Sequence, residues 1–243
     1  MRFPPLHQAG GVRVRRAGER TVSDKPWLRS RHGLASGGYE RDWPRFRSLL
    51  VVNEDTLAPG GAFSPHPHWD LEILTWVTAG VLEHTDTLGH RASVHPGELQ
   101  HVRAGSGIEH AEGNVGAAPL ELWQIWLEPR ERGLAPAYAQ AAFPAEARAG
   151  RLQLLASQGG EAGALPIALD ARVFALDLAD GHPPVEVALG ERHAWVQVLG
   201  GAARLVPEGG PPVDLGAGDA AALSDTPGFA LVGQGSLLVF DLA

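Results

Sequence analysis

The chain has 243 residues, of which 44% are hydrophobic and 20% are charged, enough apolar material for a sizeable core and against global disorder. Its net charge of -8 argues against nucleic-acid recognition by charge alone, and the absence of cysteine excludes disulfides, thiolate ligands and cysteine nucleophiles. No apolar run approaches the roughly 20 residues that cross a bilayer, and the N-terminus lacks the apolar segment of a signal peptide. We therefore expect a cytoplasmic protein that contacts no membrane.

The first part of the chain mixes basic and aromatic residues. Residues 12–21 (VRVRRAGERT) alternate over a short length and are expected to form an edge strand. Residues 30–45 are expected to form a structured loop, because Tyr39, Trp43 and Phe46 would anchor it to a core.

From residue 47 onward, short β-patterns alternate with glycine and proline turns. Residues 63–80 predict either a strand pair or one long bent strand. The Ala-rich residues 130–150 contain two prolines and predict a crossover with one helical turn, after which a second series of strands follows. A weak repeat between residues 76–99 and 195–222 favours two consecutive β-barrels.

Two short motifs carry the strongest chemical signal. An HPH motif at His66 and His68 and an HAE motif at His110 and Glu112 each place two potential ligands at i and i+2, on one face of a strand. If the two strands face each other in a small barrel, three imidazoles and one carboxylate converge. Such a set suits Fe, Mn, Ni, Cu or Zn. The second series of strands contains neither motif.

Other residues near these motifs receive smaller roles. Glu72 and Asp70 are alternative fourth ligands, because their even spacing predicts the same strand face as the HPH histidines. His84 and Asp86 form an HxD pair that could orient a neighbouring ligand. Gly105 and Gly107 are expected to allow close backbone approaches, and Pro65 and Pro67 to mark an edge or cavity rim. His90, His95 and His101 are expected at or near turns, in surface or supporting roles, and His182 and His193 are expected to be structural. The tryptophans Trp69, Trp76, Trp123 and Trp126 are expected in the core, although one of them could line an aromatic substrate pocket.

Several signatures are absent from the sequence. It has no dinucleotide-binding GxGxxG pattern, no phosphate-binding GxxxxGK[ST] loop and no GxSxG elbow. Nucleotide-dependent chemistry and serine hydrolysis therefore have no support.

The stretch from Gly60 to Glu112 resembles the signature region of the pirin family within the cupin superfamily, and most of all its bacterial quercetinase-like branch. The HPH motif, the ExxTxxxxGxxEHxDxxG run from Glu72 to Gly89, the PGE turn and the AGxGIxHxE segment match as a set. LWQIWLEP, ERHAWVQVLGG and LLVFDL extend the likeness over nearly the whole chain.

The resemblance implies an all-β bicupin fold, with two jelly-roll barrels packed together. It implies an N-terminal metal-binding domain over residues 1–135 and a C-terminal domain without metal ligands over residues 136–243. It assigns the fourth ligand to Glu112 rather than Glu72. The implied cofactor is one divalent transition metal, first of all Fe(II), with Mn, Ni, Cu, Co or Zn as alternatives, held by His66, His68, His110 and Glu112.

Function transfers less directly than fold. Members of this branch show quercetin 2,3-dioxygenase activity, which implies dioxygen and a flavonol as substrates, a metal that acts as Lewis acid, and Glu112 as catalytic base. Other pirins are transcription cofactors or bind metabolic enzymes. The alternative is therefore a non-enzymatic, metal- or redox-responsive regulatory protein that binds a transcription factor or metabolic enzyme. A third possibility is a dioxygenase or isomerase with an unrelated small substrate. We expect a monomer without direct nucleic-acid contacts.

Overall fold

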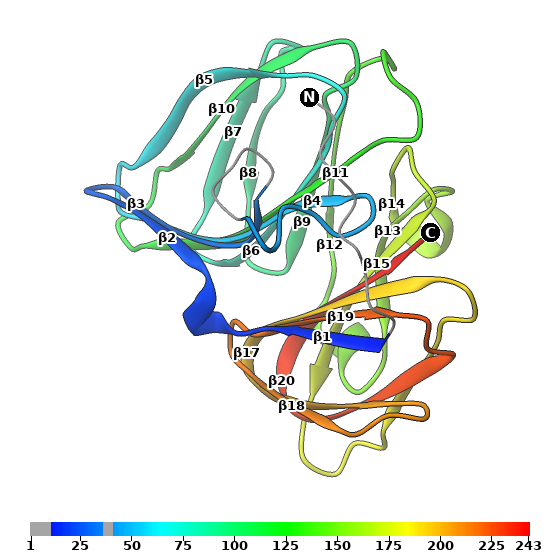
Figure 1. Cartoon of the computed structure of the whole chain (residues 1–243). Coiled ribbons are helices and arrows are strands. Elements are labelled where there is room, and N and C mark those ends of the chain that lie inside the picture. The colour runs from blue at the N-terminus through cyan, green and yellow to red at the C-terminus, as the bar shows by residue number, and fades with distance from the viewer. Residues whose placement is uncertain (1–10, 36–40) are drawn as a thin grey trace. The chain divides into compact units, whose positions relative to one another are not determined.

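The structure is a computed structural model that describes residues 11–35 and 41–243. Nearly all of their regular secondary structure is β-strand, so the predicted all-β class is confirmed. They divide into two compact units, shown in Figure 1. The N-terminal unit comprises the described residues of 21–143 together with Leu165–Leu169, and the C-terminal unit comprises residues 11–20, Pro144–Ala164 and Asp170–Ala243. The predicted domain ranges 1–135 and 136–243 stay a prediction.

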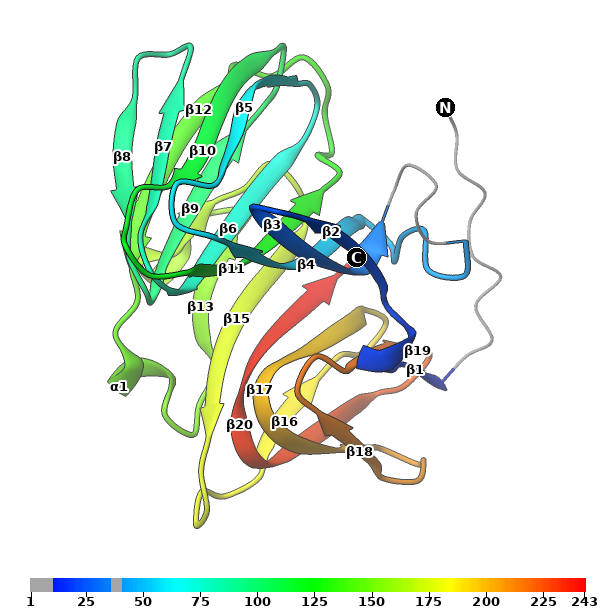
Figure 2. The ribbon, with the colours of Figure 1, turned by 90° about the vertical axis from the view of Figure 1, so that its left-hand side faces the viewer.

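The N-terminal unit consists of two antiparallel sheets. Their strands are β2 (Thr21–Lys25), β3 (Leu28–Ala35), β4 (Leu49–Leu57), β5 (Ala62–His68), β6 (Glu72–Ala79), β7 (Leu82–Asp86), β8 (Arg91–Val94), β9 (Glu98–Arg103), β10 (Ile108–Asn114), β11 (Leu120–Leu127) and β12 (Ala137–Ala142). The short β14 (Leu165–Pro166) falls within this unit but belongs to neither of the two sheets. The larger sheet has the order β12-β9-β6-β11-β4-β3-β2 and the smaller sheet has the order β5-β10-β7-β8. Figure 2 shows the strands of the smaller sheet side by side.

The C-terminal unit is built around one sheet with the order β1-β19-β17-β20-β15-β13, in which β16 also pairs with β20 and β18 with β17. Its strands are β1 (Gly11–Arg15), β13 (Gln153–Ser157), β15 (Ala171–Leu178), β16 (Val185–Ala188), β17 (His193–Pro207), β18 (Val213–Gly216), β19 (Ala220–Ser224) and β20 (Gly228–Leu242). Helical turns are η1 (Ala17–Glu19), α1 (Ala145–Arg148) and η2 (Glu161–Gly163). β1 lies at the end of the order, so the predicted edge strand is confirmed for its first part, whereas the rest of residues 12–21 contains the turn η1.

The alternation of side chains between the two faces of a sheet decides which residues face the site. Successive side chains of a strand point to opposite faces of the sheet, and directly opposed residues of antiparallel strands point to the same face. In β6, Ile73 lines the pocket described below, whereas Glu72 and Leu74 point to the other face of the sheet. All three side chains are buried, which explains why the sequence of β6 shows no simple polar–apolar alternation.

Three segments differ in part from the sequence predictions. Residues 63–80 form neither a strand pair nor one bent strand, because β5 and β6 enter different sheets and the backbone turns sharply at Asp70, where φ is 51°. Within residues 30–45, β3 continues to residue 35, and Trp43 is buried as expected, as is Phe46 just beyond. Tyr39 lies outside the described residues.

The crossover predicted over residues 130–150 contains the one helical turn as α1, but strand β12 precedes it and pairs with β9. In the part of the chain that the structure describes, no helix has the length and apolar character that a membrane span requires.

Candidate metal centre and pocket

The pairing of β5 with β10 brings the two histidine motifs together. His66 lies directly opposite His110, so both side chains point to the same face of the smaller sheet. The ring centroid of His110 is 4.6 Å from that of His66 and 5.0 Å from that of His68. One ring nitrogen from each of the three lies within 4.8 Å of the others. This spacing suits three imidazoles that converge on one cation.

His110 tests whether a metal fits. Both of its ring nitrogens are buried, and neither has a hydrogen-bond partner among the described residues. A neutral imidazole carries one acceptor nitrogen, and leaving it buried without a partner costs roughly 1–3 kcal/mol. Burial lowers the pKa of His110, and burial with the charges of His110 and His66 lowers the pKa of His68 to about 4. The rings are therefore held in the neutral form that binds metals.

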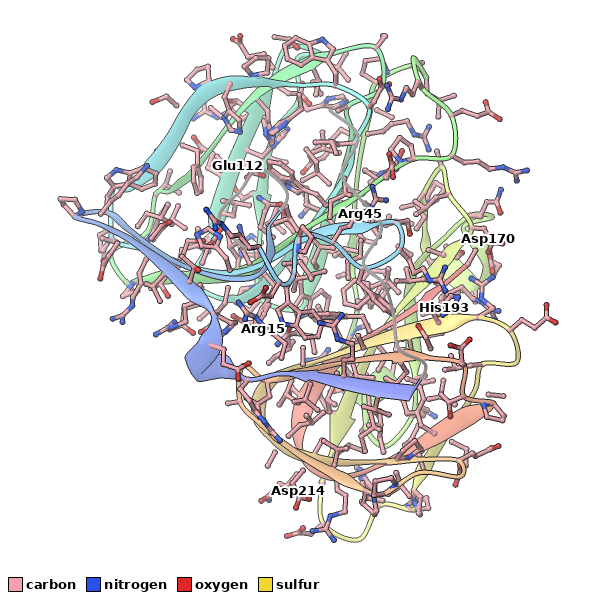
Figure 3. All side chains as sticks on the ribbon, viewed as in Figure 1. Arg15, Arg45, Glu112, Asp170, His193 and Asp214 are labelled. Atoms are coloured by element: carbon pink, nitrogen blue, oxygen red, sulfur yellow. The ribbon has the colours of Figure 1, made fainter. Side chains whose placement is uncertain are left out.

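Glu112, labelled in Figure 3, is 3% exposed, and one of its carboxylate oxygens lies within 4.8 Å of a ring nitrogen of His110. The side-chain amide of Gln100 donates to Oε1 at 2.6 Å and that of Gln124 donates to Oε2 at 3.1 Å, while His84 Nδ1 is 3.9 Å from Oε1. Burial raises the pKa of Glu112, but the neighbouring His84, the charge of His110 and the Gln100 amide outweigh it and lower the pKa to about 2. Glu112 is therefore ionised at neutral pH.

The two glutamines belong to a row of polar side chains across the inner face of the larger sheet. Directly opposed pairs link His32 to Asn53, Asn53 to Gln124, Gln124 to Thr75, and Thr75 to Gln100. We call these five residues the polar rung. Thr75 Oγ1 donates to Gln124 Oε1 at 3.1 Å, and Gln100 Nε2 lies 3.3 Å from Thr75 Oγ1. These bonds leave both amide groups oriented toward Glu112.

Sequence reasoning missed the polar rung. A partial signal was present, because Thr75 and Gln124 each lie between large apolar residues of their strand, and a buried polar residue needs a partner. The partners, however, come from strands far apart in the chain, so the row appears only once the register is known.

His84 connects Glu112 to a second set of groups. Its Nε2 lies 3.2 Å from Asp86 Oδ2, which confirms the predicted pair, and Asp86 Oδ2 in turn lies 2.9 Å from His90 Nδ1. The His84 ring stacks on Tyr138 with centroids 4.7 Å apart. Burial disfavours the charged form of His84, but Glu112 and Asp86 outweigh it and raise its pKa. The structure also groups His84, His110 and Glu112 within ligand distance of one another.

The alternative fourth ligands lie elsewhere. Glu72 accepts hydrogen bonds from His101 and, at 3.0 Å, from Arg103 Nε, on the opposite face of β6 from the pocket. Asp70 accepts a hydrogen bond from the backbone of Gly133 at 2.7 Å. The prediction that both share the face of the HPH histidines was wrong, because the turn at Asp70 breaks the alternation. The prediction of a turn position for His101 was also wrong, since it is buried within β9.

The two glycines before His110 allow close approaches, as predicted. Gly105 has a φ of 46°, and a Cβ there would lie 2.0 Å from the Leu134 carbonyl oxygen. Gly107 has a φ of 136°, and a Cβ there would lie 2.8 Å from Trp69 Nε1. Trp69 itself is 59% exposed, so its predicted core position was wrong. Any larger residue at either glycine would displace the chain that leads into the site.

A pocket of about 240 Å³ opens beside the histidines. Side chains from both sheets line it: Ser23, Lys25, Leu28, Ser30, His32, Asn53, Asp55, Phe63, His66, His68, Ile73, His110, Glu112, Gln124 and Trp126. The smaller sheet contributes the histidines, and β2, β3 and β4 of the larger sheet contribute a polar wall. The ring centroid of Trp126 lies 5.0 Å from that of His68. A small aromatic ligand in this pocket would touch both the histidines and the polar wall.

Comparisons with known proteins agree with this arrangement. The family model described as pirin matches residues 14–127, and the one described as the quercetinase C-terminal cupin domain matches residues 154–242. A protein of Escherichia coli (strain K12) named quercetin 2,3-dioxygenase is 36% identical over 192 residues, which cover 78% of this chain and 82% of that protein. A pirin-like protein of Caulobacter vibrioides is 39% identical over 161 residues, or 65% of this chain and 69% of that protein.

A solved structure gives the same result. The bacterial pirin YhhW from Escherichia coli, in complex with nickel(II), is 32% identical and superposes with a TM-score of 0.87 over 95% of this chain and 98% of that chain. The likeness thus extends through both units, each of which is a cupin-type domain. On these matches, the chain belongs to the pirin family.

Proposed function

We propose that this protein is a metal-dependent dioxygenase that opens the ring of a flavonol such as quercetin. Relatives named quercetin 2,3-dioxygenase support the reaction class. The observation that carries the proposal is His110, whose buried ring nitrogens have no partner among the described residues and which lies beside His66 and His68 at the wall of a pocket.

In this proposal, His66, His68, His110 and Glu112 hold one divalent transition metal. Three imidazoles and a carboxylate accommodate Fe(II), our first expectation, as well as Mn, Co, Ni, Cu and Zn. The nickel(II) complex of the Escherichia coli relative supports a divalent ion. When bound, the metal supplies a Lewis acid and a template that orients the substrate.

The protein's own residues would bind and orient the reactants. Ring opening consumes one flavonol and one dioxygen and releases carbon monoxide and a depside, and the 3-hydroxyl group must first lose its proton. We assign that proton to Glu112 as base, which is ionised and held by the Gln100 and Gln124 amides. Phe63 and Trp126 line the pocket and would cover the ring faces against water.

Oxygen uptake tests the proposal directly. Protein loaded with Fe(II) or Ni(II) should consume dioxygen when quercetin is added and release carbon monoxide in equal amount. If no metal form consumes oxygen with any flavonol, the flavonol dioxygenase proposal fails, and specific capture of a partner protein would then favour the regulatory alternative.

Glu112→Gln tests the base. The variant should keep part of the metal, because an amide oxygen can still ligate, but lose most turnover. Full turnover with full metal content would remove Glu112 from the role of base.

A further inference from the structure

The pocket wall across from His66, His68 and His110 carries two pairs of polar side chains, one of which belongs to the polar rung. On β3 and β4, Ser30 lies directly opposite Asp55 and His32 lies directly opposite Asn53. All four face the pocket. Two strands that each carry polar residues at i and i+2 toward a buried space therefore build one hydrogen-bonding surface.

Most of this surface is satisfied internally. His32 Nδ1 lies 3.1 Å from Asn53 Oδ1, and His32 Nε2 lies 2.8 Å from Ser23 Oγ. Ser30 lies directly opposite Asp55, and its hydroxyl lowers the pKa of that carboxyl. These bonds fix the positions of the side chains before any ligand arrives.

Asp55 is the exception. It is 4% exposed, and its Oδ1 is buried with no hydrogen-bond partner in the described part of the chain. A buried acceptor without a donor costs roughly 1–3 kcal/mol, so the fold tolerates here a cost that a bound donor would remove. Because Asp55 lines the pocket, that donor can come from a ligand.

The charges around Asp55 fit a role in binding a neutral donor. Burial raises its pKa to about 7; the bond from Ser30 lowers it, and the charges of Glu112 and Glu54 raise it. The other titratable groups that line the same pocket are Lys25 on β2, His32 on β3, His66 and His68 on β5, and His110 on β10. Oδ1 can accept a hydrogen bond whether or not the other oxygen carries a proton.

We propose that Asp55 is a specificity-determining residue, whose Oδ1 accepts a hydrogen bond from a hydroxyl group of an aromatic ligand held at the histidine cluster. The inference rests on the proposed function, because it takes the ligand to be a hydroxylated aromatic. A site built to bond a hydroxyl rejects the analogue that lacks it, since the site's own polar group is then left unpaired.

The test measures the binding of a flavonol series to the metal-loaded full chain in the absence of oxygen. Quenching of the protein's tryptophan fluorescence reports the binding. The series is 3-hydroxyflavone, galangin, kaempferol and quercetin, which gain hydroxyl groups in steps. In the wild type, at least one step should lower Kd about tenfold or more. In Asp55→Leu that step should shrink to less than about threefold, and Asp55→Asn, which keeps an acceptor oxygen, should restore part of it.

Glu54→Gln is the matched control, since it removes a carboxylate at the adjacent position of the same strand, on the other face, where Glu54 pairs with Arg31. It should retain the full step. Metal content must equal that of the wild type in every variant, and Asp55→Ala replaces the leucine variant if the latter does not fold.

The outcomes separate the two proposals. If the wild type binds no flavonol, the proposed function and this inference fall together. If it binds them and every ratio is unchanged in Asp55→Leu, this inference alone is overturned. If the ratio collapses in Asp55→Leu but the wild type consumes no oxygen, the inference stands and the dioxygenase proposal fails.

Discussion

The interiors of the two units differ in what fills them. The C-terminal unit is filled mainly by an apolar core cluster, in which Leu176, Val196, Leu205, Leu231 and Val239 are among the fully buried members. In the N-terminal unit, the inner face of the larger sheet carries the polar rung, and the smaller sheet carries the histidines. The antiparallel framework is common to both, so the framework alone does not make a site. The site arises where polar groups replace apolar ones and each finds a partner or a ligand.

The variant His110→Ala in the N-terminal unit tests this difference between the units most strongly. We expect almost complete loss of bound metal, because the variant removes the nitrogen shared by both candidate ligand groups. Elemental analysis of purified protein measures it. His182→Ala, an exposed histidine of the C-terminal unit, should keep full metal content. Unchanged metal content in His110→Ala would show that the histidine cluster does not hold the metal.

Leu205→Ala addresses the other side of the comparison. Leu205 is fully buried in the apolar core, so the variant should lower the free energy of unfolding by about 2–5 kcal/mol. Urea denaturation monitored by tryptophan fluorescence measures this loss. Metal content per folded chain should stay unchanged. A parallel loss of metal would show that the C-terminal core contributes to the site.

Glutamine variants sharpen the contrast, because both units bury glutamine side chains in strands: Gln100 and Gln124 in the N-terminal unit and Gln197 in the C-terminal unit. Gln100→Leu removes a donor to Glu112 and should weaken metal affinity by about 10–100-fold with little change in stability. Gln197→Leu is the matched control, since among the described residues the Gln197 amide donates only to backbone carbonyls of the C-terminal unit. Competition with a chelator measures both. Equal affinities would argue that the polar rung does not serve the metal.

The smallest expected effect is a gain in stability. Burial raises the pKa of Asp55 from its ordinary value of 3.8 to about 7, so the folded state binds the proton more tightly than the unfolded state. The free energy of unfolding of the wild type therefore falls as the pH rises from about 4 through 7. Asp55→Asn removes this loss. In metal-free protein it should be more stable than the wild type at pH 8, by on the order of 1–3 kcal/mol, with the gap closing toward pH 4.

Thermal unfolding at several pH values measures that gap. A constant difference across the range would mean that Asp55 does not carry the buried charge. Together with the binding series, the pH dependence distinguishes a role of Asp55 in ligand binding, at a cost in stability, from a purely structural role.

The sequence was most informative where chemistry lies close along the chain. His66, His68 and His110 could be predicted as a cluster, because i and i+2 spacing fixes the strand face and two such strands need only pair in register. The sequence could not exclude Glu72, since the turn at Asp70 that reverses its face depends on a left-handed backbone conformation that no motif marks. Spacing indicated Glu112 as a possible ligand, but only the family resemblance favoured Glu112 over Glu72.

Groups that depend on long-range register stayed hidden. Thr75 meets Gln100 across 25 residues and Gln124 across 49, and nothing local distinguishes such positions from isolated polar residues. Asp55 lies in the run NED, which reads as an ordinary polar strand end. Only its pairing with Ser30 shows that it faces the pocket.

One last consequence follows from the prolines of β5. This strand is at the outer end of the smaller sheet, where an unpaired backbone invites strands of other molecules to add and sheets to grow. Pro65 and Pro67 lack the N–H groups that such growth would use, and prolines are accommodated in strands where that side faces outward. Strand β5, which carries His66 and His68, is thereby protected against the addition of further strands. It needs no covering segment, which would also block the access of a ligand.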